Sequence, residues 1–241
     1  MNPILEVTGL TRRFKKRTIL DSVDLRLEAD QTACLLGTNG AGKSTLLRCL
    51  LALDRPNSGT VRIAGLDPFK RERQVRELVG YVPDHADADP WMTVPDFLRF
   101  LAPHYPNWSK SKAEHYAQEL ELPTDRTFNE MSRGEAGKAL LVGALAFSPK
   151  LLVLDEAFAR LAPLVREEVL EFFVREAPLE GGAALVATHD LEIASRLADR
   201  IWMLDDSKLQ DHDPVQFPPD ESTQSQLRSL YTTDDSEALA G

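Results

Sequence analysis

A glycine-rich stretch, GTNGAGKS at residues 37–44, constrains the fold of this chain more than any other part of its sequence. It matches the pattern G-x-x-x-x-G-K-[ST], and it lies between the apolar run ACLLG and the helix-like run KSTLLRCLLAL. A loop of this kind between a buried strand and a helix cradles phosphate groups with its backbone amides. The pattern therefore predicts a strand, loop and helix that bind a nucleotide. The alternative is a glycine-rich turn without a ligand.

Each position of this loop has an expected role. Lys43 is expected to reach the outer phosphates, and the Ser44 hydroxyl is expected to bind Mg²⁺. The other positions expected to surround the nucleotide are Gly37, Thr38, Asn39, Gly40, Ala41, Gly42 and Thr45.

A second motif, LLVLDE at residues 151–156, begins with an apolar run typical of a parallel strand buried on both faces. Asp155 at its carboxyl end is predicted to hold the hydration shell of Mg²⁺. Glu156 is predicted to orient or deprotonate the attacking water. The alternative is a pair of solvated acids at a strand end. Together with the phosphate loop, the motif indicates ATP hydrolysis.

Strand-like and helix-like runs alternate along most of the chain, which predicts an α/β layer fold with a mainly parallel sheet. The runs at residues 4–7 and 23–27 flank the basic stretch RRFKKR and predict an antiparallel pair. Between residues 84 and 122 the pattern changes to helices and proline-rich joints, with Trp91 and Trp108 at the breaks.

Composition excludes several classes of protein. An apolar share of 43% in 241 residues is that of an ordinary globular protein. A net charge of -10 argues against broad nucleic-acid binding, so no nucleic acid is expected as a partner. The longest apolar run, ALLVGALAF, is far below the roughly 18 residues of a membrane span, and a cytoplasmic chain is expected. Cys34 and Cys49 lack metal-ligand spacing and are expected in the core.

The stretch MSRGEAGKAL at residues 131–140 predicts a helix that begins at Ser132. One interpretation is a capping box, in which the side chains of Ser132 and Glu135 bind each other's backbone amides. The other is an anion site, because the helix end attracts phosphate and Gly134 allows close approach to the backbone.

His189 follows the strand-like run LVAT at the predicted carboxyl edge of the sheet. Ligands of open α/β folds gather at this edge, so His189 is a candidate for the site. The alternative is a satisfied cap in which Asp190 pairs with the histidine.

Taken in order, these motifs resemble the ATP-binding subunit of an ABC transporter over residues 4–204. GTNGAGKST looks like the Walker A loop, LLVLDE like the Walker B strand, and VATHD like the switch-histidine motif, while MSRGE stands where the family carries LSGGQ. The resemblance implies a P-loop NTPase core with a mainly parallel sheet, an N-terminal antiparallel β subdomain and a helical subdomain inserted at about residues 84–148. We predict this domain over residues 1–210, followed by an acidic, mobile tail at residues 211–241.

The resemblance also implies a second cassette as partner, because the signature of one family subunit covers the ATP held by the P-loop of the other. Ser132 and Gly134 match the phosphate-contacting positions of the signature. Arg133 and Glu135 depart from the family's glycine and glutamine, and their opposite charges are expected to cancel in part near a phosphate.

Two further positions follow from the resemblance. Phe14 falls where an aromatic ring stacks on adenine, and the alternative is a core residue at a strand end. Asp84 replaces the Q-loop glutamine and is expected to offer an oxygen ligand to Mg²⁺, the alternative being a turn residue after Pro83. Ala162 and Ala157 replace the D-loop aspartate and the proline after the Walker B glutamate.

The function implied is ATP hydrolysis, with Lys43, Glu156 and His189 as the catalytic residues and ATP and Mg²⁺ as cofactors. The resemblance places the chain at the inner face of the cell membrane, where it powers a separate permease, and the motifs are closest to those of ABC-2 type exporters. One alternative is a soluble ABC ATPase that acts on nucleic acid or ribosomes. Another is a catalytically weak cassette paired with a fuller one. A P-loop GTPase or small-molecule kinase is disfavoured because the sequence has no N-K-x-D stretch.

Overall fold

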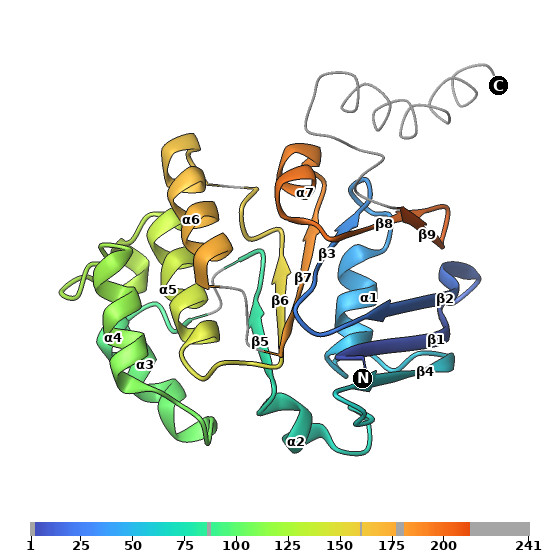
Figure 1. Ribbon diagram of the computed structural model, residues 1–241, viewed down its shortest axis with the longest axis horizontal. Coiled ribbons are helices and arrows are strands. Elements are labelled where there is room, and N and C mark those ends of the chain that lie inside the picture. Colours follow the sequence, from blue (N-terminus) through green and yellow to red (C-terminus); the bar gives the residue numbers. More distant parts are fainter. Residues whose placement is uncertain (1–2, 86–87, 160, 177–180, 213–241) are drawn as a thin grey trace.

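The computed structural model contains two β-sheets, with the antiparallel one at one side of the molecule (Figure 1). The structure describes residues 3–85, 88–159, 161–176 and 181–212. One sheet has three strands in the order β2-β1-β4, and the other has six in the order β5-β6-β7-β3-β8-β9. The predicted α/β architecture with a mainly parallel sheet is confirmed.

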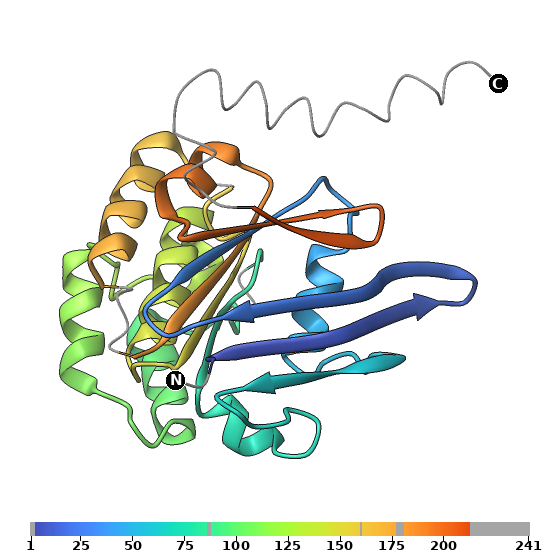
Figure 2. The same ribbon diagram turned by 45° about the vertical axis from the view of Figure 1, so that its right-hand side comes forward.

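The smaller sheet is antiparallel, and its strands are β1 (Leu5–Phe14), β2 (Arg17–Leu27) and β4 (Ser58–Ile63). The two runs predicted as a pair are the ends of a longer hairpin between β1 and β2. From Val23 onward, buried apolar and exposed polar residues alternate along β2, so one face of this sheet is packed and the other is solvated. In Figure 2 the strands of this sheet pass in front of α1.

The larger sheet holds five parallel strands, which are β3 (Thr32–Leu36), β5 (Val79–Val82), β6 (Leu151–Asp155), β7 (Ala183–Thr188) and β8 (Arg200–Asp205). Every residue of β6 and β7 is buried, because apolar side chains pack on both faces of these strands. Their carboxyl ends, and that of β3, therefore meet at one edge of the sheet, where the predicted motifs begin.

Nine helical segments occur among the described residues, namely α1 (Lys43–Leu50), α2 (Glu72–Arg76), α3 (Val94–Leu101), η1 (Ala102–His104), α4 (Lys110–Glu119), η2 (Phe128–Glu130), α5 (Arg133–Leu145), α6 (Pro163–Glu176) and α7 (Leu191–Leu197). The helices α3 and α4 pack on α5, which itself lies against β5 (Figure 1). None of the helices that the structure describes is long and apolar enough to cross a lipid bilayer.

The strand β9 (Lys208–His212) was not predicted from the sequence. It pairs antiparallel with β8 at the sheet edge, where backbone hydrogen bonds form a strand without an apolar pattern. The prediction placed Asp211 and His212 in the acidic tail, whereas both lie in β9. The rest of that predicted tail, residues 213–241, lies outside the described residues.

Both cysteines are free and fully buried, Cys34 in β3 and Cys49 in α1. Burial raises the pKa of both thiols, that of Cys49 to about 11. Since the thiolate is the reactive form, we expect neither cysteine of the folded chain to react with a thiol-specific chromogenic reagent at about pH 8, and both to react in denaturant. Rapid reaction in buffer would contradict the buried positions of β3 and α1.

Candidate functional site

The phosphate loop joins β3 to α1 and is held tightly against its surroundings. Gly42 is the N-cap of α1 with φ 111°, in the left-handed region that favours glycine. A Cβ atom on Gly37 would lie 2.8 Å from the carbonyl oxygen of Leu204. No side chain caps α1, so the amides of its first turn are left to face the loop. These features fit a loop that binds an anion through its backbone.

Lys43 is 6% exposed, and its ammonium group lies inside the loop. Its Nζ donates a hydrogen bond of 2.6 Å to the carbonyl oxygen of Gly37 and lies 3.2 Å from Oε1 of Glu156. The loop and the strand β6 therefore meet at this ammonium group.

Glu156 directly follows β6 and connects two residues that are far apart in the sequence. Its Oε2 lies 2.9 Å from Nδ1 of His189, while its Oε1 faces Lys43. Its amide donates to the carbonyl oxygen of Ala187, and its φ is 51°, a left-handed conformation that is strained for a residue other than glycine. The backbone thus holds this carboxylate between the lysine and the histidine.

His189 does not form the cap that was considered as an alternative. Asp190 caps α7 through the amide of Glu192 at 2.9 Å and accepts a hydrogen bond from Arg166 at 3.1 Å. Nδ1 of the His189 ring instead contacts Oε2 of Glu156. His189 therefore lies beside Glu156, near the phosphate loop.

Asp155 is buried at the carboxyl end of β6. Burial raises its pKa, the charges of Glu156 and Asp84 act in the same direction, and a hydrogen bond with Ser44 acts against them. Within the described part of the chain, its buried Oδ1 has no hydrogen-bond partner. A buried carboxylate oxygen that needs a positive partner, beside a serine hydroxyl, fits a Mg²⁺ site.

A hollow of about 400 Å³ brings most of the predicted residues together. Its lining includes Phe14, Thr38, Asn39, Gly40, Gly42, Lys43, Ser44, Thr45, Asp84 and Glu156. Gly37, Ala41, Asp155 and His189 do not line it, although Asp155 directly precedes Glu156 and Nδ1 of His189 lies 2.9 Å from the Glu156 carboxylate. Arg17 and Ile19 also line the hollow, and sequence reasoning missed them because only the hairpin brings β2 to the loop.

Phe14 is 44% exposed at the end of β1, so the alternative of a core residue is wrong. One face of its ring is covered by the guanidinium of Arg12, whose Cζ lies 4.2 Å from the ring centroid. A ring at the rim of the hollow can stack on a nucleotide base.

The signature stretch begins α5 with the predicted capping box. The Ser132 hydroxyl accepts from the amide of Glu135 at 3.2 Å, and Oε2 of Glu135 accepts from the amide of Ser132 at 2.8 Å. The amide of Ser132 lowers the pKa of Glu135, and the Ser132 hydroxyl and Arg126 act in the same direction. Glu135 forms an ion pair with Arg126, a partner that the sequence did not indicate.

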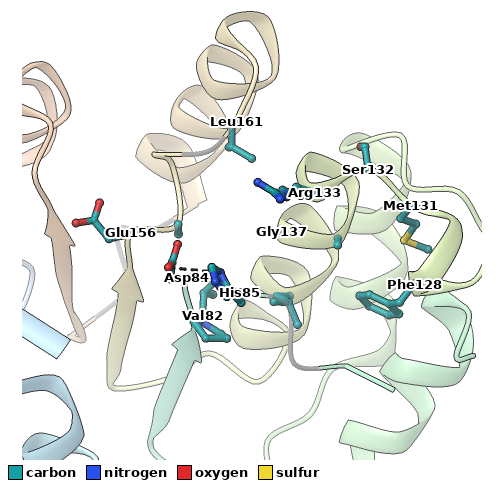
Figure 3. A pocket seen from close by; sticks show the side chains of 14 residues that line it. Val82, Asp84, His85, Phe128, Met131, Ser132, Arg133, Gly137, Glu156 and Leu161 are labelled. Atoms are coloured by element: carbon teal, nitrogen blue, oxygen red, sulfur yellow. Dashed lines mark ion pairs between the residues drawn. The ribbon is translucent and has the colours of Figure 1, made fainter. Parts of the chain in front are cut away.

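Ser132 and Arg133 line a different cleft, of about 290 Å³, shown in Figure 3. Asp84 lies on the opposite side of this cleft from Ser132, with its Oδ2 3.4 Å from Nδ1 of His85. Asp84 and Glu156 line both this cleft and the hollow at the phosphate loop. The signature therefore does not line the nucleotide hollow of its own chain.

The fold and the site define a P-loop nucleoside triphosphatase, in which the glycine-rich loop and the two acids after β6 meet at the carboxyl edge of a parallel sheet. The family model described as "ABC transporter" matches residues 20–159. The chain belongs to the ABC transporter family. It is an ATP-binding cassette and an ATPase of the ABC type.

Several proteins are similar to the chain along most of their length. An uncharacterized ABC transporter ATP-binding protein of Methanocaldococcus jannaschii is 32% identical over 84% of this chain and 83% of its own. The aliphatic sulfonates import ATP-binding protein SsuB of Corynebacterium glutamicum is 31% identical, with coverages of 96% and 92%. A solved ATP-binding subunit of an ABC transporter superposes with a TM-score of 0.84 at 25% identity, over 95% of this chain and 99% of that chain.

Proposed function

We propose that the chain binds MgATP at its phosphate loop and hydrolyses it to power a separate membrane permease. The observation that carries this proposal is the position of Glu156, which lies 3.2 Å from Nζ of Lys43 and 2.9 Å from Nδ1 of His189. These three residues lie far apart in the sequence, and the parallel sheet brings them together beside a hollow suited to a nucleotide.

Each of these side chains has a chemical role in the proposal. Lys43 exchanges its present contacts for the outer phosphates of ATP, and Glu156 orients or deprotonates the attacking water. His189 holds the Glu156 carboxylate in place through its Nδ1. Ser44 and Asp155 would hold Mg²⁺, and Asp84 would offer a further oxygen ligand. The bound ion would neutralise phosphate charge.

Two cassettes are needed for the complete site. The signature residue Ser132 lines the cleft beside α5 and not the hollow at the phosphate loop of its own chain, and Gly134 lies on the first turn of α5 after it. We therefore propose that these residues contact ATP bound by a second cassette. The phosphates of that ATP would meet the first turn of α5. A solved cassette described as dimeric, 22% identical with a TM-score of 0.77, supports the likeness in fold.

A groove on the helical region is our candidate for the permease contact. It has a volume of about 610 Å³, lies between α2 and the α3–η1 segment, and includes Arg73, Phe100 and Tyr105 in its lining. Phe100 is 54% exposed, and Trp91, just before α3, is 73% exposed. Contiguous apolar surface marks protein contacts, and Phe100 and Tyr105 lie together in this groove. Binding there would place the chain at the cytoplasmic face of the membrane.

The test is affinity purification of the tagged chain from native membranes in mild detergent. We expect a multi-span protein in stoichiometric amount, and we expect the variant Phe100→Ser to lose it while ATP hydrolysis continues. Leu53→Ser is the matched control, because Leu53 is also 54% exposed but does not line the groove. Recovery of the parent chain with ribosomes or nucleic acid would replace the transporter proposal with the soluble ATPase alternative.

We also propose export as the direction of transport, because the motif sequences are closest to those of ABC-2 type exporters. A Nod factor export protein of Cupriavidus metallidurans and the sulfonate importer are both 31% identical to the chain, so identity does not choose between directions. Transport into or out of inside-out vesicles that contain the co-purified permease would decide it.

A further inference from the structure

An ion pair lies on the signature and is not used by the mechanism above. Arg126 contacts Oε1 of Glu135, and the two side chains are 45% and 27% exposed. Glu135 is on the first turn of α5, the same turn that holds Ser132 and Gly134. The charge at this turn is therefore set by two residues nine positions apart.

A carboxylate here has opposite effects on the chain and on a ligand. Within the chain, Glu135 stabilises the helix end, because it accepts from the amide of Ser132 at 2.8 Å. For a phosphate that approaches the same amides, its negative charge is repulsive. A cation that pairs with Oε1 removes most of this repulsion and leaves the capping box intact.

The position of Arg126 is fixed by its neighbours. A second capping box follows at once, in which the amide of Thr127 donates to Oε2 of Glu130 at 2.9 Å and η2 begins. Arg126 directly precedes Thr127, so this turn holds its backbone near the start of α5. Arg133 makes no ion pair within the described residues, and in Figure 3 its side chain points away from Ser132 toward Leu161.

We propose that Arg126 is a positioning residue of the signature, which neutralises Glu135 and holds its carboxylate so that Ser132 and Gly134 can receive the phosphate of ATP bound by a second copy of this chain. The inference rests on the proposed function. Arg126 itself acts through Glu135.

The test combines the variants Arg126→Gln, Glu135→Gln and the double variant in the full chain. ATP-driven dimerisation is measured by analytical ultracentrifugation in a Glu156→Gln background, and ATP affinity of the monomer is measured with a fluorescent ATP analogue at low protein concentration. A unit negative charge roughly 6 Å from a bound phosphate would weaken ATP-driven dimerisation about 100-fold at an effective dielectric constant of about 20. Exposure of Glu135 to solvent reduces this effect to about tenfold.

We expect Arg126→Gln to weaken dimerisation about tenfold while the ATP affinity of the monomer stays unchanged. The double variant, Arg126→Gln with Glu135→Gln, should dimerise like the parent, since no negative charge is left to neutralise. The Arg126→Lys variant should retain most of the dimerisation. An Arg126→Gln chain that dimerises like the parent would overturn the inference, and so would a double variant that is no better than Arg126→Gln alone.

Two further outcomes separate this inference from the proposed function. If the parent binds ATP and dimerises but the two substitutions act independently, the positioning role of Arg126 is wrong and the proposed function stands. If the parent neither binds ATP nor dimerises, the proposed function falls and the inference falls with it. Thermal unfolding of each variant shows whether a loss comes from misfolding.

Discussion

Replacement of Lys43 with methionine is expected to abolish ATP hydrolysis and to lower the affinity for ATP at least about 100-fold. Methionine keeps the apolar stem of the side chain but removes its charge. The ammonium group lies 2.6 Å from the carbonyl oxygen of Gly37 and 3.2 Å from Glu156, so it is a cation placed between the loop and the acid. Without it, the outer phosphates would meet Glu156 with no ammonium group between them.

Isothermal titration with ATP and Mg²⁺ measures this loss directly. Lys70→Met is the matched control, because it removes the same charge from an exposed ion pair with Asp67 that is not part of the hollow. Affinity of the Lys43→Met chain within a few fold of the parent would show that the loop does not use its lysine. Far-ultraviolet circular dichroism of both variants shows whether the fold is retained.

Substitution of Glu156 with glutamine is expected to lower the turnover rate by about 10² to 10⁴ while ATP remains bound. Glutamine has nearly the same shape and can still contact His189 and Lys43, but it cannot accept the proton of the attacking water. The ATP-bound dimer should therefore accumulate. Single-turnover kinetics with radiolabelled ATP separate this effect from slow product release.

Glu28→Gln serves as the control for this substitution, since Glu28 forms an exposed ion pair with Arg26 on the antiparallel sheet. It should hydrolyse ATP like the parent. If the Glu156→Gln chain also hydrolyses ATP at the parental rate, Glu156 is not the general base, and Asp155 becomes the candidate to examine.

The parts of this protein that could be predicted from its sequence are those that short segments determine. The residues 37–44 predict a phosphate loop because the glycines and the lysine act within one strand-to-helix turn. The run LLVLD predicts a buried strand because it is apolar on both faces. The meeting of these segments at one edge follows from the rule that parallel strands share a direction.

The features that could not be predicted depend on contacts between segments. Arg126 is nine residues from Glu135, and only the turn at η2 brings them together. The strand β9 lacks an apolar pattern because it lies at a sheet edge and pairs through its backbone. The hairpin carries Ile19 and Arg17 to the phosphate loop, and nothing in the local sequence of β2 indicates that neighbour.

The left-handed backbone at Glu156 has a consequence for how this chain can change. A residue other than glycine with φ near 51° costs about 1–2 kcal/mol, a strain that glycine would relieve. A glycine at position 156 would relieve this strain, but it would also remove the carboxylate that pairs with the buried Lys43 and with His189. The strained backbone is therefore retained for the carboxylate that it carries, and selection for turnover maintains the glutamate there.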